Sequence, residues 1–233
     1  MRSTEIPTSK IKTKLLDAAE FQIATRGFDA VSVRDITQLA KANVAAINYH
    51  FGSREGMMLL LIARRLEPIY QKQLENLDHL EKKRGSRAVP LEELLEAWIR
   101  PLFINVSKDE RKDEVLRHSV ARILTLPVSK LSNSLQDSGR ELWKRYLRAL
   151  GKCLKDTPTE ELAWRLQLLN GSAIQFLMGA ESIEAWTGLG SDLAPVEKRL
   201  SRLLRLVAPM MRESGTGEMG KEVAKGPQGT FDF

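Results

Sequence analysis

Hydrophobic residues recur at helical spacing along most of this chain, and no stretch alternates residue by residue as a half-buried strand does. In the first segment, Leu16, Ala19 and Ile23 fall on one face of a helix. We expect this helix to run from Ser9 to about Arg26. Similar apolar stripes return throughout the second half of the chain. The pattern therefore predicts an all-α fold.

Residues 32–55 predict two short helices joined by a tight turn. Ser32 and Asp35 have the spacing of a capping box at the start of a helix that ends near Lys41. Asn43 is a suitable N-cap for a following helix over residues 44–51. This arrangement is typical of a helix-turn-helix.

A long helix is predicted next, because Ser53 is a suitable N-cap and the helical pattern continues to about Leu80. Pro68 lies inside this stretch. It predicts a kink or break over residues 64–68, since proline lacks a backbone N–H and clashes with the preceding turn. The polar residues 82–90 are expected to link this helix to the rest of the chain.

Two apolar stripes near the C-terminus step alternately by four and three residues, a narrow seam that suits close helix packing. The side chains of this seam are Leu162, Leu166, Leu169, Ala173, Phe176, Val196, Leu200, Leu203 and Val207. They can form a four-helix interface between two copies of the chain, or they can pack within one copy. Spacing alone does not separate the two interpretations.

The composition is that of a globular protein, with 42% hydrophobic and 28% charged residues. A single cysteine, Cys153, excludes a disulfide framework or a cysteine-based zinc site within one chain. No apolar run is long enough to span a membrane, and the N-terminus lacks the apolar core of a signal peptide. We therefore expect a cytoplasmic protein without membrane association, metal or cofactor.

Positive charge is concentrated near the N-terminus. Residues 1–65 carry ten Lys or Arg and six Asp or Glu, which leaves them a net charge of +4 out of +6 for the chain. An uneven basic balance of this kind favours an anionic partner.

The predicted helix over residues 44–51 has the outward face that a groove-reading helix needs. Residues 44–46 are small enough to let the helix sink into a major groove, and Ile47 is the residue expected to point inward. Asn48 and Tyr49 supply polar groups that reach further out.

Residues 11–60 resemble the DNA-binding domain of the TetR (tetracycline repressor) family. The matching pieces are LLDAA at 15–19, RGF at 26–28, SVRDI at 32–36 and NYHFGSRE at 48–55. The resemblance implies an all-helical homodimer that binds a double-stranded DNA operator. It divides the chain into a helix-turn-helix domain (1–52), a helical ligand-binding and dimerisation domain (53–212) and a disordered tail (213–233).

The same resemblance implies roles for individual residues. It implies base contacts from Arg34, Val44, Ala45, Ala46 and Tyr49. It implies contacts to the DNA backbone from Ser32, Asn48, His50 and Arg54. Arginine can bond a guanine edge and small apolar side chains can meet a thymine methyl, which agrees with these roles. The alternatives are a solvated Arg34, an inward Tyr49 and a core His50.

Three residues depart from the family pattern. Asn48 stands where many members have tyrosine, Lys41 where the turn usually has glycine, and Ala42 where it usually has valine. A lysine in a left-handed turn costs about 1 kcal/mol. We expect Lys41 to add a cation near the DNA backbone in return.

A narrower resemblance concerns the effector. The strings AAINYHFGSRE and ELAWRLQLLNGSAIQFLMG are similar to fatty-acid-responsive regulators of the PsrA type, which implies a long-chain acyl ligand such as a fatty acid or acyl-CoA. The candidate pocket residues are Trp98, Leu102, Phe103, Arg117, His118, Val120, Arg122 and Phe176. The alternatives are core packing for the apolar members and a salt bridge to an acid such as Glu114 for the cationic ones.

We therefore expect a transcriptional repressor that a small apolar ligand releases from its operator. The alternatives are an activator or a ligand-independent DNA binder of the same family and, more remotely, a helical lipid carrier or an enzyme. An enzyme is disfavoured because the chain has three histidines and neither HExxH nor GxSxG. Residues 215–220 spell GxGxxG, but no predicted strand precedes them.

Overall fold

The computed structural model describes residues 8–103, 110–178, 185–188 and 196–213. Helices make up most of these residues, and none of them lies in a strand, so the prediction of an all-α fold is confirmed. The elements are α1 (Thr8–Arg26), α2 (Val33–Ala40), α3 (Ala45–Phe51), α4 (Arg54–Arg84), α5 (Leu91–Phe103), α6 (Glu110–Leu124), the 3₁₀ helix η1 (Val128–Lys130), α7 (Asn133–Cys153), α8 (Thr159–Met178) and α10 (Val196–Arg212). The predicted tail lies outside the described residues from 214 onward.

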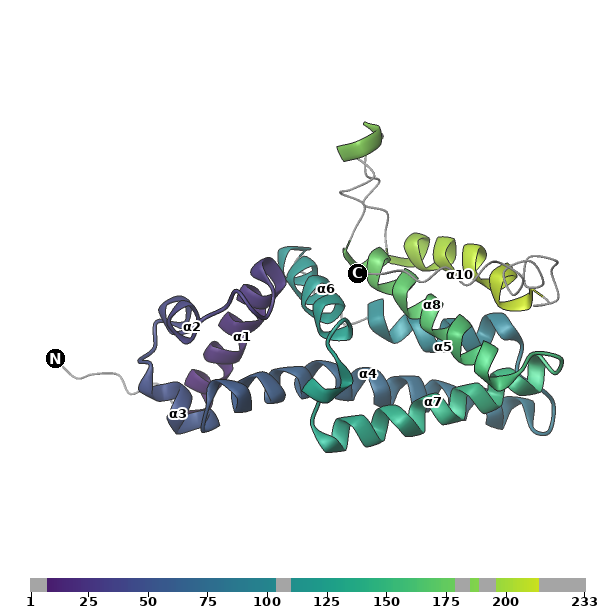
Figure 1. Ribbon diagram of the computed structural model, residues 1–233, viewed down its shortest axis with the longest axis horizontal. Helices are drawn as coiled ribbons and strands as arrows, with labels where there is room; N and C mark the ends of the chain where they lie inside the picture. Colours follow the sequence, from purple (N-terminus) through teal and green to yellow (C-terminus); the bar gives the residue numbers. More distant parts are fainter. Residues whose placement is uncertain (1–7, 104–109, 179–184, 189–195, 214–233) are drawn as a thin grey trace, which may run out of the picture.

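The molecule is elongated, and α4 runs along it (Figure 1). Helices α1–α3 gather at one end, around the start of α4. Helices α5, α7, α8 and α10 gather around its other end, and α6 lies against α1 between the two groups. We call α1–α3 with the first turns of α4 the head, and the remaining helices the body.

The head has its own hydrophobic core. Leu15 and Ile23 of α1, Ile36 of α2 and Ile47 of α3 are all buried there, together with Met57 at the start of α4. Ile47 is 1% exposed, which confirms that it points inward. Burying these side chains stabilises a three-helix unit that would otherwise be too small to hold its shape.

A larger core fills the body, and it buries most of the seam that was expected either to pair two copies or to pack within one copy. The side chains buried in this core include Leu162, Leu166, Leu169, Ala173, Leu200, Leu203 and Val207. Phe176 packs against it half-buried, and the side chain of Val196 lies outside the described residues. Seven of the nine seam residues are thus buried within one copy of the chain, because α8 and α10 use this stripe on each other and on α5.

Helix α4 decides between the two outcomes expected at Pro68 as far as a break is concerned. It runs unbroken from Arg54 to Arg84 with Pro68 inside it, so of the kink or break expected over residues 64–68 the break does not occur. Pro68 lies on the exposed side of α4, where water can bond the backbone carbonyl that loses its partner. The linker predicted over residues 82–90 is also shorter, because α4 ends at Arg84 and not near Leu80.

Polar contacts join the head to the body along two helices. Arg65 of α4 holds Glu20 of α1 with two parallel hydrogen bonds, and both side chains are largely buried. Arg122 of α6 donates from Nε to the carbonyl of Ala24, in the last turn of α1 (3.1 Å). Added to the shared helix α4, these contacts fix how the head sits on the body.

A small hydrophobic cluster lies at the same boundary. Ile62 and Leu66 of α4 pack with Ile123 of α6 and Leu135 of α7, and Phe28 of the head packs against them. Phe28 also packs against the head core. We call this group the junction cluster, since it connects the head to three body helices.

No helix within the described residues is long and apolar enough to cross a membrane. The described part of the chain also holds no group of three or more His, Cys, Asp or Glu side chains arranged to bind a metal ion.

Candidate DNA-binding surface

Helix α2 begins at a complete capping box. The Ser32 hydroxyl accepts a hydrogen bond from the Asp35 amide (3.2 Å), and the Asp35 carboxylate accepts one from the Ser32 amide (2.9 Å). The Ser32 hydroxyl also donates to that carboxylate (2.6 Å). These bonds, aided by Arg26 at 3.4 Å, hold the pKa of the Asp35 carboxyl below its usual range. The start of α2, where Arg34 is exposed, is thereby fixed.

The turn after α2 is left-handed at Lys41, with φ 52° and ψ 46°. The Lys41 amide donates to the Gln38 carbonyl (3.2 Å) and the Ala42 amide to the Thr37 carbonyl (2.9 Å). This pair of bonds is a Schellman motif, which usually places glycine at the left-handed position. Within the described ranges, Lys41 is the one non-glycine residue with positive φ. The expectation of a lysine in a left-handed turn is confirmed.

Helix α3 starts one residue later than predicted, at Ala45. Asn43 still caps it, because its side-chain oxygen accepts a hydrogen bond from the Ala45 amide (2.9 Å). The next helix is capped as predicted, since the Ser53 hydroxyl accepts from the Gly56 amide (3.0 Å). The turn geometry on both sides of α3 is therefore set by local hydrogen bonds.

The outward face of α3 is open to solvent. Tyr49 is 80% exposed and Val44 is 47% exposed, although both lie within three residues of the buried Ile47. Ala45 and Asn48 are exposed on the same short helix. In the free protein Tyr49 does not pack inward, so its ring is available to a partner.

Two of the predicted contact residues are also engaged within the head. Arg54 donates from its guanidinium to the carbonyls of Phe28 (2.9 Å) and Val31 (3.0 Å), so it braces the loop before α2. His50 is half-buried, with its ring edge-on to that of Tyr49 at 4.9 Å between centroids. Both side chains therefore also help to hold the head together.

The remaining predicted contact residues lie together on the start of α2, the turn and α3. We call them the recognition surface: Ser32, Arg34, Lys41, Val44, Ala45, Ala46, Asn48 and Tyr49. Two cations, three polar side chains and three small apolar side chains on the start of α2, the turn and α3 can bond phosphates and base edges and still fit a groove.

Residues 15–61 match the family described as bacterial regulatory proteins of the tetR family, and residues 96–210 match a tetracyclin repressor-like C-terminal domain. Together the two matches cover well over half of the chain. The chain belongs to the TetR family. It is a DNA-binding transcriptional regulator, and members of this family are not enzymes.

Several known proteins resemble this chain in part of its sequence or in its fold. The "Probable HTH-type transcriptional regulator YttP" of Bacillus subtilis is 38% identical over 64 residues, which are 28% of this chain and 30% of that protein. A TetR-like regulator from Rhodococcus sp. RHA1 has a similar structure (TM-score 0.57, 16% identity, 90% of this chain and 100% of the other). So does a transcriptional regulator from Saccharomonospora viridis solved with choline (TM-score 0.52, 21% identity, 86% and 96%).

The apolar residues predicted to line the effector pocket lie in the body core. Trp98, Leu102, Phe103 and Val120 are at most 5% exposed, and Phe176 packs beside them half-buried. The indole N–H of Trp98 donates to the side-chain oxygen of Asn170 (2.8 Å). Burial of these side chains in the body is what the core-packing alternative expects.

The cationic residues predicted to anchor a ligand have different surroundings. Arg122 donates to the carbonyl of Ala24, and His118 lies 3.1 Å from the carbonyl of Met178. Burial, with a smaller effect from Arg199, lowers the pKa of Arg117. Sequence reasoning missed the contact of Arg122 with the head, because nothing local marks a bond that spans 98 residues.

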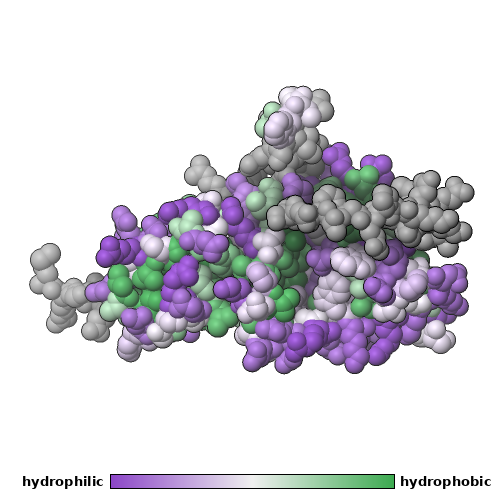
Figure 2. Space-filling model, viewed as in Figure 1, coloured by the Kyte–Doolittle hydropathy of each residue, from purple (hydrophilic) through white to green (hydrophobic). Residues whose placement is uncertain are grey.

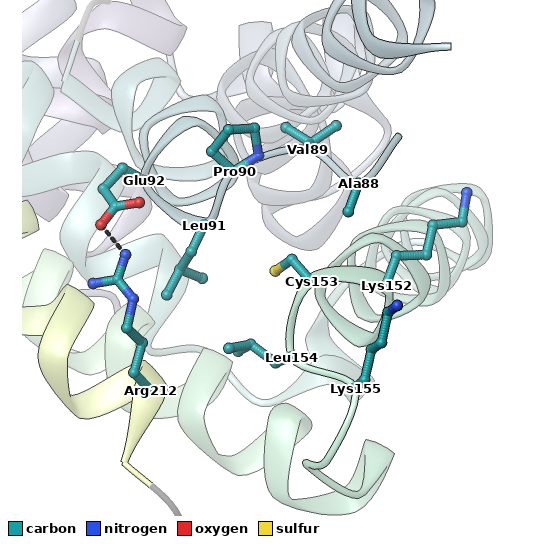
Figure 3. A pocket seen from close by; sticks show the side chains of 10 residues that line it. All are labelled: Ala88, Val89, Pro90, Leu91, Glu92, Lys152, Cys153, Leu154, Lys155 and Arg212. Atoms are coloured by element: carbon teal, nitrogen blue, oxygen red, sulfur yellow. Dashed lines mark hydrogen bonds and ion pairs between the residues drawn. The ribbon is translucent and has the colours of Figure 1, made fainter. Parts of the chain in front are cut away.

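A cavity of about 650 Å³ lies at the end of the body, where α5 begins and α7 and α10 end (Figure 3). Leu91 and Leu154 form apolar walls, and the thiol of Cys153 points between them. Arg212 bonds Glu92 across one side. Burial raises the pKa of the Cys153 thiol. None of the predicted pocket residues lines this cavity.

Proposed function

We propose that this protein is a homodimeric repressor that leaves its operator when a small apolar ligand binds to the body. The recognition surface carries the proposal. On a helix of seven residues, Ile47 is 1% exposed and Tyr49 is 80% exposed. A short helix that is anchored on one side and open on the other can be inserted into a major groove without unfolding the head.

The release mechanism is supported by how the head is attached. Helix α4 contributes to the cores of both head and body, and Arg122 of α6 bonds the carbonyl of Ala24. A ligand that favours one position of α4 or α6 therefore shifts the populations of head positions. Two recognition helices read successive major grooves only when they lie about 34–36 Å apart, so a shift of either head weakens binding.

Two observations support the ligand part of the proposal. A structure of similar fold contains choline, so the fold can hold a small molecule. The apolar, long-chain acyl character of the ligand rests on the resemblance to PsrA-type regulators.

A different face of α8 and α10 supports the dimer. Trp164 and Leu168 of α8 and Leu206 of α10 are 57–64% exposed, although they are large and hydrophobic. On α8, the exposed residues Trp164, Leu168, Gly171 and Gln175 follow one another at spacings of four, three and four residues. Gly171 has open space above it, so a second helix can approach closely there. We place the partner copy on this face.

The DNA-binding part is tested with fluorescence anisotropy on a random-sequence duplex between 50 and 200 mM salt. Binding should weaken steeply with salt. Tyr49→Ala should reduce affinity for genomic fragments selected by the wild-type protein. Trp186→Ala removes an equally exposed aromatic ring (87%) outside the head and should have no effect. Salt-independent binding, or equal losses in the two variants, would contradict the proposal.

The dimer is tested by sedimentation velocity. Leu168→Glu places a charge at the centre of the proposed interface and should produce monomers. Val128→Glu, at a site of similar exposure (62%) on η1, should leave the dimer intact. A Leu168→Glu protein that remains dimeric would move the interface elsewhere.

A further inference from the structure

A second cavity, of about 500 Å³, is lined mainly by α7 and by Tyr70 of α4, and these two helices run side by side (Figure 1). Its walls are mainly apolar, with Tyr70 from α4, Leu131 after η1, and Leu135, Trp143 and Leu147 from α7. We call it the α4–α7 groove. A volume of this size suits a small molecule and is too small for a protein segment with its own core.

The aromatic walls of the groove are held in place. The ring of Trp143 lies edge-on to that of the buried Trp98, with 5.6 Å between centroids. The Tyr70 ring packs against Gly139, where an added Cβ would lie 3.5 Å from the ring. The side-chain amide of Gln136 donates from Nε2 to the Leu131 carbonyl (3.0 Å) and fixes the corner between η1 and α7. Such preformed apolar walls favour a ligand with a flat or extended apolar body.

The rim of the groove is positive. Arg140 lies there and bonds Asp137. Lys144 lies one turn further along α7, exposed, and has no acidic partner among the residues the structure describes. The outer edge of α7 is hydrophilic in the space-filling view (Figure 2). An apolar floor with an unpaired ammonium at its rim is complementary to an amphipathic monoanion.

The groove also touches the boundary with the head. Leu135 lines the groove and belongs to the junction cluster, and Tyr70 and Leu131 line the groove and pack against that cluster. That cluster includes Phe28, which packs against the head core as well. A molecule that wedges these three side chains apart therefore displaces the packing of the head.

We propose that the α4–α7 groove binds a small amphipathic anion, with its apolar body between Tyr70 and Trp143 and its acid group at Lys144. Binding there is transmitted to the head through Phe28. The site lies outside the body core in which the effector pocket was predicted. Transmission to DNA rests on the proposed function, whereas binding in the groove does not.

The proposal is tested with two probes that share this chemistry, anilinonaphthalene sulfonate and dodecanoate. Their affinities for the full chain are measured by calorimetry, and the site is located by hydrogen–deuterium exchange. Protection is expected over residues 66–72 and 128–147, with altered exchange over residues 24–31. Comparing the affinities of the two probes shows whether the groove prefers an aromatic body, as in the sulfonate, or an acyl body, as in dodecanoate.

Two variants and one control make the test specific. Lys144→Gln should weaken binding about fivefold, because it removes one charge-assisted contact at a partly exposed site. Gly139→Leu, which fills the groove against Tyr70, should abolish binding. Arg148→Gln removes a similarly exposed cation from the next turn of α7 and should change affinity less than twofold.

The proposal is overturned if neither probe binds, if protection maps elsewhere, or if Lys144→Gln and Arg148→Gln behave alike. A change in sedimentation on Gly139→Leu would instead assign the groove to a second copy of the chain and would also overturn it. If the probes bind as expected but no DNA binding is found in the salt series, the proposed repressor function is wrong and the proposed ligand site in the groove still stands.

Discussion

Replacing Lys41 by glycine should stabilise the head and weaken its hold on DNA at the same time. The residue sits at φ 52° and ψ 46°, a conformation that costs a lysine about 1–2 kcal/mol. Glycine adopts it freely but loses about 0.5–1 kcal/mol more in backbone entropy. The net gain in free energy of unfolding should therefore be about 0.5–1 kcal/mol, measured by urea denaturation.

The effect on DNA follows from the lost charge. If each protomer loses one phosphate contact, the slope of log affinity against log salt falls by about 1.8 for the dimer. Between 50 and 200 mM salt, the wild-type protein should therefore lose about tenfold more affinity than Lys41→Gly. Anisotropy with a random duplex measures the slope without knowledge of the operator.

Lys41→Gln is the matched control, because it removes the charge and keeps the left-handed residue non-glycine. It should lose DNA affinity like Lys41→Gly without becoming more stable. If the two variants are equally stable, the turn stores no strain. If their salt slopes equal that of the wild type, Lys41 does not contact phosphate.

Three further substitutions or treatments test other parts of the structure. Glu20→Ala leaves the largely buried Arg65 unpaired and should lower the free energy of unfolding by about 3–5 kcal/mol, whereas Glu20→Leu with Arg65→Met should recover much of it in urea denaturation. Asp35 has a lowered pKa in the folded state, so its contribution to stability is present above its unfolded pKa and is lost as pH falls through the folded one. The stability difference between wild type and Asp35→Asn should therefore be constant near neutral pH and shrink below about pH 4, in urea titrations at a series of pH values. Burial raises the pKa of Cys153, so iodoacetamide should label it more slowly in the folded chain than in urea, and faster as pH rises; equal rates near neutral pH would show that the thiol is exposed.

Much of the head could be predicted from sequence because its decisive interactions are local. The capping box joins Ser32 to Asp35 within one turn, and the cap of α3 joins Asn43 to a residue two positions on. The left-handed conformation of Lys41 could be predicted because Lys41 occupies the turn between the two helices of the motif, at a position that usually holds glycine. The inward Ile47 follows from helical periodicity on a helix too short to offer another anchor.

The body shows where sequence reasoning stopped. The stripe that includes Leu166 and Leu203 was correctly read as a packing surface, but periodicity cannot say which helix will cover it. The structure covers it within the protomer and leaves Trp164, Leu168 and Leu206 on the other face. The hydrophobic effect stabilises buried apolar area equally whether the covering helix belongs to the same chain or to a second one. Only the tertiary arrangement therefore decides which helix covers the stripe.

What the sequence determined by itself is a helix-turn-helix head of the TetR family, in an all-helical chain with a basic N-terminal region. Its signals are hydrogen bonds and spacings within about four residues. Only the tertiary structure decided that α4 passes Pro68 unbroken, that Arg65 pairs with Glu20, and that Arg122 reaches Ala24. These contacts join residues 45 and 98 positions apart, and they form because packing two cores on one helix brings those side chains together.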